Sequence, residues 1–127
     1  MPGIVLTLPL APGKVEAWRR FCQELSGARQ PPHEASRWRM RVTREQLALV
    51  ESLEGAYAVM TLEADDVNLA LAALIGSDLP FESWYRGRLQ DLHGISLTHY
   101  AQYARPAPAD EPPEVLFDWT QPDLAKA

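Results

Sequence analysis

The sequence predicts an α+β fold with four strands and two helical segments, each of which is broken in two. Three features lead to this prediction. Four short segments, beginning near residues 4, 46, 56 and 114, have the apolar runs or the alternation typical of strands. Two longer segments repeat apolar residues at spacings of three and four, which places them on one helix face. The 127 residues suffice for a single domain with a hydrophobic core.

The first strand is expected over residues 4–8, and a helix follows it from residue 14. Pro12-Gly13 separates the two, because neither residue favours the interior of a regular element. The apolar side chains that share one face of this helix are Val15, Trp18, Cys22 and Leu25. The paired Pro31-Pro32 is expected to break the helix, which then resumes over residues 33–40.

The next two strands are expected over residues 46–51 and 56–63, paired as an antiparallel hairpin. Gly55 lies between them and can take the positive φ that a tight reversal needs. In the second of these strands, Ala58, Met60 and Leu62 point to one face, and Tyr57, Val59, Thr61 and Glu63 to the other. The first set suits packing under helices, whereas the mixed second set suits the wall of a cavity or a contact with a partner.

Two further helices are expected after the hairpin. Asp65-Asp66 caps the first, over residues 67–75, because carboxylates accept hydrogen bonds from the free N–H groups of a first turn. The second covers residues 81–92, with Pro80 in its first turn, where the missing N–H does no harm. It ends at His93-Gly94, since glycine readily takes the left-handed conformation that closes a helix.

The fourth strand is expected over residues 114–119, where Val115, Phe117 and Trp119 alternate with less apolar residues. A loop rich in proline and alanine, beginning at Arg105, precedes it. The domain is therefore expected to span residues 1–119, and residues 120–127 to form a C-terminal tail.

This order of elements, βαββαβ, is that of the ferredoxin-like fold, in which the helices cover one face of a four-stranded antiparallel sheet. The other face would be left uncovered. A partly apolar sheet face on a soluble protein is commonly buried by a second copy of the chain. We therefore expect a homodimer.

Short motifs in the same order resemble a known group of proteins. Pro12-Gly13-Lys14, followed by Glu16 and Trp18, resembles the strand-to-helix entry of the dimeric α+β barrel superfamily, which includes antibiotic-biosynthesis-monooxygenase-like proteins. More closely, the chain resembles a small uncharacterised bacterial family within this superfamily. The segments that carry this resemblance are Leu10 to Lys14 with Trp18-Arg19, Ser36-Arg37 through Thr43-Arg44-Glu45, Asp65-Asp66, Ser77-Asp78 through Pro80-Phe81 with Trp84, His93-Gly94, and Leu116 to Trp119. The resemblance spans most of residues 4–119. The resemblance implies a dimeric barrel. Members of the superfamily often act without metal or flavin on aromatic or polyketide-like substrates, or bind haem through a histidine.

Composition and charge exclude several classes of protein. The net charge of −5 disfavours nucleic acid as a partner, because phosphate binding draws on a basic surface. No stretch approaches the ~20 apolar residues of a membrane span, and no secretory signal is evident, so we expect a cytoplasmic protein. The signatures of phosphate loops, structural zinc sites, zinc proteases and esterases are missing. We accordingly expect no metal and no cofactor.

A cavity between the sheet and the broken helices is the expected site. His93 is the candidate proton acceptor, and Arg37 and Arg39 are candidates for binding an anion. Trp38, Tyr57 and Trp84 are candidate aromatic walls. The sequence thus predicts a protein that binds a small apolar or anionic molecule. The alternatives are a cofactor-independent monooxygenase-like or isomerase-like enzyme, and a purely structural dimerisation module.

Overall fold

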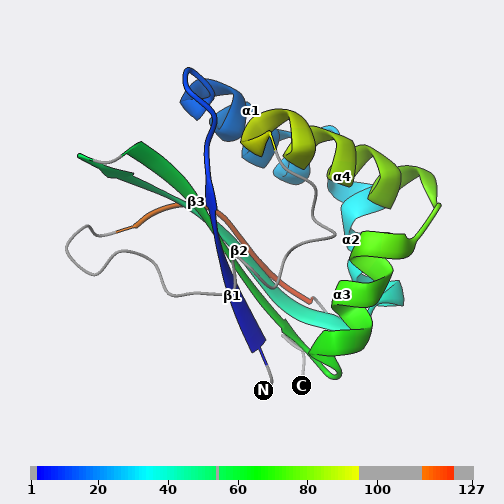
Figure 1. Cartoon of the computed structure of the whole chain (residues 1–127). Coiled ribbons are helices and arrows are strands. Elements are labelled where there is room, and N and C mark those ends of the chain that lie inside the picture. The colour runs from blue at the N-terminus through cyan, green and yellow to red at the C-terminus, as the bar shows by residue number, and fades with distance from the viewer. Residues whose placement is uncertain (1–2, 54, 95–112, 122–127) are drawn as a thin grey trace.

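The computed structural model describes residues 3–53, 55–94 and 113–121, in which four helices lie on one face of a four-stranded antiparallel sheet (Figure 1). In chain order the elements are β1 (Gly3–Pro9), α1 (Val15–Ser26), α2 (Gln30–Arg39), β2 (Val42–Ser52), β3 (Gly55–Ala64), α3 (Val67–Gly76), α4 (Pro80–His93) and β4 (Glu114–Thr120). The predicted α+β class, antiparallel sheet and broken helices are confirmed. The loop from Arg105 to residue 112 and residues 122–127 of the predicted tail lie outside the described residues.

The break between α1 and α2 falls before the two prolines rather than at them. Pro31 and Pro32 occupy the first turn of α2, where an N–H has no partner within the helix and its loss costs little. The helix therefore begins at Gln30, three residues before the predicted start. The apolar face of α1 is buried as predicted, with Trp18, Cys22 and Leu25 each at most 1% exposed.

The strand order is β1-β3-β2-β4, which corrects the predicted ferredoxin-like arrangement. In that arrangement the last strand lies beside the first, whereas here β4 pairs with β2 and leaves β1 at the opposite edge. Leu47 of β2 faces Phe117 of β4 in the register of this pair. The sheet is open, with both β1 and β4 as edges.

Side chains on both faces of β4 favour its position beside β2. On the outer face, Arg44 of β2 donates two hydrogen bonds of 3.3 Å to Asp118. On the helix side, Phe117 and Trp119 pack edge-on against the ring of His33, with centroids 5.1 and 5.3 Å away. The strand is thus held by β2 and by α2, elements that are distant from it in the sequence.

The interior between helices and sheet is filled rather than hollow. Its large cluster of buried apolar residues includes Leu8, Phe21, Leu47, Leu71 and Leu89, each at most 2% exposed. The space left beside Leu71 and Leu74 measures about 10 Å³, which is about what one water molecule needs. The predicted cavity at this location is therefore not found among the described residues.

The opposite face of the sheet is less bare than predicted. Ala48, Val50 and Val59 form a second buried cluster there, at 3%, 0% and 8% exposed. Apolar exposure remains at the two edge strands, where Val5 is 37% and Val115 49% exposed. Within the described ranges, no helix has the length and apolar character that crossing a membrane requires.

Candidate functional site

A pocket of about 520 Å³ lies where α2 gives way to β2, within the range of small-molecule sites. We call it the α2–β2 pocket; its lining residues are Trp38, Arg39, Arg41, Thr43, Asp65 and Gln121. They come from four separate parts of the chain: the end of α2, the start of β2, the β3–α3 junction and the residue after β4. The lining combines an aromatic ring, two guanidinium groups and three neutral or acidic oxygen-bearing groups.

The end of α2 sets the direction of the two basic side chains. The helix ends with Trp38 and Arg39, and Met40 follows as its cap. Arg41 then takes a left-handed conformation with φ of 56° and turns the chain into β2. Its carbonyl accepts a hydrogen bond of 3.2 Å from the N–H of Asp65, so the β3–α3 junction is tied to the same point.

The conformation of Arg41 is unusual for its residue type. Arg41 is the one described residue other than glycine with a positive φ. The left-handed region costs a residue with a Cβ about 1–2 kcal/mol, and helices that end this way normally use glycine. Strained backbone of this kind tends to be kept at functional sites. An arginine at this position therefore suggests that its side chain is needed in the pocket.

Arg39 is held by a carboxylate behind the pocket. Its Nη2 donates to both oxygens of Glu82, at 3.1 and 3.2 Å, and Ser77 Oγ donates to the same carboxylate at 3.0 Å. Burial would raise the pKa of Glu82, but the hydrogen bonds from Ser77, Arg39 and Ser36 outweigh it and lower the pKa below its usual value. Glu82 is thus ionised at neutral pH, and it fixes one nitrogen of Arg39 while the others stay available.

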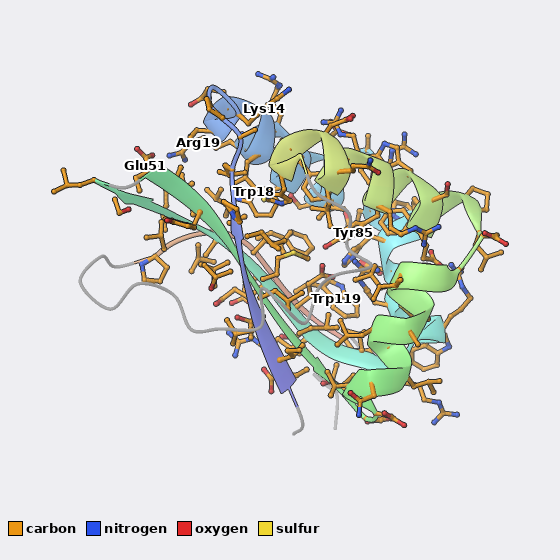
Figure 2. All side chains as sticks on the ribbon, in the orientation of Figure 1. Lys14, Trp18, Arg19, Glu51, Tyr85 and Trp119 are labelled. Atoms are coloured by element: carbon orange, nitrogen blue, oxygen red, sulfur yellow. The ribbon has the colours of Figure 1, made fainter. Side chains whose placement is uncertain are left out.

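A second polar cluster, which is fully buried, has Glu45 of β2 at its centre. Its other members are Arg37, His33 and Tyr85, and all four are at most 1% exposed. Glu45 accepts hydrogen bonds from Arg37 Nε at 2.6 Å and Nη2 at 3.1 Å, from His33 Nε2 at 2.7 Å and from the Tyr85 hydroxyl at 2.8 Å. Figure 2 shows Tyr85 of α4 and Trp119 of β4 reaching into this layer between helices and sheet.

The Glu45 cluster is suited to holding the fold rather than to proton transfer. Burial would raise the pKa of Glu45, but Arg37 and His33 outweigh it and hold the pKa far below its usual range. Burial and the neighbouring carboxylate raise the pKa of Tyr85 well above its usual value, so its hydroxyl keeps its proton. With four hydrogen bonds accepted, the carboxylate has no lone pair left for a substrate.

His93, the predicted proton acceptor, lies at the end of α4 and lines no part of the α2–β2 pocket. Its Nδ1 donates to the carbonyl of Pro9 at 3.0 Å, because a carbonyl can only accept. Nε2 therefore carries a lone pair, which is buried and without a partner in the described part of the chain. Burial lowers the pKa of His93 to about 4, so the ring is neutral at pH 7.

The other predicted site residues are dispersed. Trp38 and Arg39 do line one pocket, whereas Arg37 points into the buried Glu45 cluster. Tyr57 lies on the sheet face away from the helices, packed against Val50 and its neighbours. Trp84 is on α4, stacked with Phe21 at 5.6 Å, and the guanidinium of Arg29 lies 4.3 Å above its ring.

Sequence reasoning missed Arg41, Thr43, Asp65 and Gln121 as pocket residues, and Glu45 as a buried one. For Glu45 a signal exists, because it has the same parity along β2 as the core residues Leu47 and Leu49. Gln121 carries no such signal, since its place in the pocket depends on the pairing of β4 with β2.

No family model, curated protein or solved structure matches the chain. Among the described residues, no group of three or more histidine, cysteine, aspartate or glutamate side chains is placed to hold a metal ion. The lone cysteine, Cys22, is buried, and burial raises the pKa of its thiol to about 12. The α2–β2 pocket, which combines an aromatic ring with charged groups of both signs, is the candidate functional site.

Proposed function

We propose that this protein binds a small molecule with an aromatic ring and a carboxylate in the α2–β2 pocket. The observation that carries the proposal is the combination of an exposed indole with two guanidinium groups in one pocket. Trp38 is 57% exposed, although tryptophan rings are largely buried in most folded proteins. A flat ligand would cover it, and a carboxylate can accept two parallel hydrogen bonds from a guanidinium.

Arg41 is the side chain best placed to receive the carboxylate. Several arginines among the described residues form no ion pair with an acidic side chain, and of these Arg41 is the one that lines this pocket. A guanidinium that meets no carboxylate among the described residues is available to bind one on a ligand. The backbone strain at Arg41 supports the same assignment, because glycine would be less costly there.

The binding is tested by titrating ¹⁵N-labelled protein with 3-phenylpropanoate and following the Trp38 indole N–H resonance. Saturable shifts are expected in the wild type, and Arg41→Gln should weaken binding by roughly tenfold or more, since a charge-assisted hydrogen bond contributes about 1.5–3 kcal/mol. Arg20→Gln is the matched control, because Arg20 lies on α1 and lines no part of this pocket. A Trp38 signal that never moves, or equal affinities for Arg41→Gln and the wild type, would refute the proposal.

We also propose that the protein forms a homodimer and that it belongs to the dimeric α+β barrel superfamily. The exposed Val5 and Val115, on the edge strands β1 and β4, support the dimer. Light scattering on the purified chain tests it, and a mass of one subunit at micromolar concentration would exclude it. The proposed ligand pocket lies on one chain and does not depend on the dimer.

A further inference from the structure

The charges around the α2–β2 pocket balance before any ligand arrives. Arg39 is already paired with Glu82, which is 2% exposed and lies behind it. The charge of Arg39 is therefore largely compensated, and its remaining N–H groups act as hydrogen-bond donors rather than as an excess cation. What is left in the pocket is one guanidinium, from Arg41, and one carboxylate, from Asp65.

These two groups are neighbours that do not neutralise each other. The N–H of Asp65 donates to the carbonyl of Arg41 at 3.2 Å, so their backbones are in direct contact. Yet neither side chain takes part in an ion pair with any described residue. Asp65 does not cap α3 either, since the N–H of Leu69 is accepted by Asp66, at 3.1 Å. The pocket is thus lined by one cation and one anion whose backbones are hydrogen-bonded and whose side chains form no ion pair with a described residue.

We propose that the ligand is a zwitterion, an aromatic α-amino acid or a close analogue, whose carboxylate meets Arg41 and whose ammonium group meets Asp65. This inference rests on the proposed function and specifies its ligand. A plain carboxylate would bring a like charge close to Asp65, and a plain amine would bring one close to Arg41. Only a ligand that carries both charged groups, as an α-amino acid does on its Cα, can pair with both side chains. The ring of this ligand then lies against Trp38.

Thr43 favours the same orientation of the ligand. Its hydroxyl donates to the carbonyl of Glu63 at 3.1 Å, so the oxygen is left to accept a hydrogen bond. An ammonium group offers three donors and no acceptor, which suits an oxygen beside a carboxylate. Arg39, with its free N–H groups, is a second donor for the ligand carboxylate.

Three probes that share a phenylethyl skeleton and differ in the charged groups that they carry test the inference: L-phenylalanine, 3-phenylpropanoate and 2-phenylethylamine. Each is titrated into the full chain at pH 7 and one fixed ionic strength, with the Trp38 indole resonance and calorimetry as readouts. L-phenylalanine is expected to bind at least roughly tenfold more tightly than either probe of single charge, which corresponds to about 1.4 kcal/mol for the second charge.

Variants assign each charge to its partner. Asp65→Asn should reduce the ratio of the affinities for L-phenylalanine and 3-phenylpropanoate from roughly tenfold to about one. Arg41→Gln should reduce the ratio of the affinities for L-phenylalanine and 2-phenylethylamine from roughly tenfold to about one. Asp91→Asn is the matched control, because Asp91 is an exposed carboxylate on α4 outside this pocket. Its preferences should equal those of the wild type.

The outcomes separate this inference from the proposed function. If 3-phenylpropanoate binds as tightly as L-phenylalanine to the wild type, the zwitterion is wrong and the carboxylate pocket stands. A preference for L-phenylalanine that survives in Asp65→Asn also overturns the inference, because the ammonium group would then bind elsewhere. If none of the three probes moves the Trp38 resonance at millimolar concentration, both proposals are wrong.

Discussion

Replacing Glu45 by glutamine should strongly destabilise this protein, because the change removes the charge that pairs with the buried Arg37. Glu45 is 1% exposed and receives four hydrogen bonds, two of them from Arg37. The amide of glutamine offers one acceptor oxygen, and its NH₂ group would face the donors of Arg37 or Tyr85. The guanidinium of Arg37, itself 1% exposed, would be left in the interior without its ion-pair partner.

The expected cost follows from the burial of that charge. Removing one partner of a buried ion pair costs about 3–5 kcal/mol, because the other charge stays desolvated. A domain of this kind has a total stability of about 5–15 kcal/mol, so the change would remove a large share of it. The double variant Arg37→Met with Glu45→Met should recover much of the loss, since no unpaired charge remains in the core.

Urea unfolding followed by tryptophan fluorescence measures these free energies. Glu51→Gln is the matched control: it lies on the same strand with its side chain 62% exposed and 3.9 Å from Arg19, and should change stability by less than about 0.5 kcal/mol. The pKa of Glu45 is held below its usual 4.5, so its contribution is fully present above that pH and is lost as the pH falls further. A decrease of the unfolding free energy of less than about 1 kcal/mol in Glu45→Gln at pH 7 would refute this reasoning. So would a difference in unfolding free energy between Glu45→Gln and the wild type that does not become smaller below pH 4.5.

Two further substitutions test other parts of the structure. The pKa of His93 is lowered from 6.5 to about 4, so the neutral ring stabilises the fold above pH 6.5, and this contribution of about 3 kcal/mol is lost as the pH falls to about 4. His93→Asn keeps a donor for the Pro9 carbonyl and removes the titration, so the unfolding free energy should depend less on pH between 4 and 6.5; an unchanged pH profile would contradict the assignment. Arg41→Gly should relieve backbone strain and raise the unfolding free energy by about 0.5–1 kcal/mol. It should also weaken the binding of 3-phenylpropanoate at least as much as Arg41→Gln does. A Gly variant that is both less stable and equally able to bind would show that Arg41 has a structural role only.

The sequence by itself determined the kind of every element among the described residues and most of their bounds, although β2 begins at Val42 rather than at residue 46. Strand and helix periodicities depend on neighbours a few positions apart, so the sequence alone predicts the apolar face of α1 and the alternation of β3. The cap at Asp66 and the turn at Gly55 are local in the same sense. Their chemistry is complete within four residues of the chain.

Strand order, the buried charges and the pocket were decided only by the tertiary structure. The same alternating pattern lets β4 pair with β1 or with β2, and the choice falls to Arg44, Asp118 and the rings packed on His33, which are far apart in sequence. Likewise Glu45 finds Tyr85 forty residues away, and Gln121 reaches the pocket only because β4 pairs with β2. Local periodicity reports which way a side chain points, but the group that it meets there is set by the competition among long-range contacts.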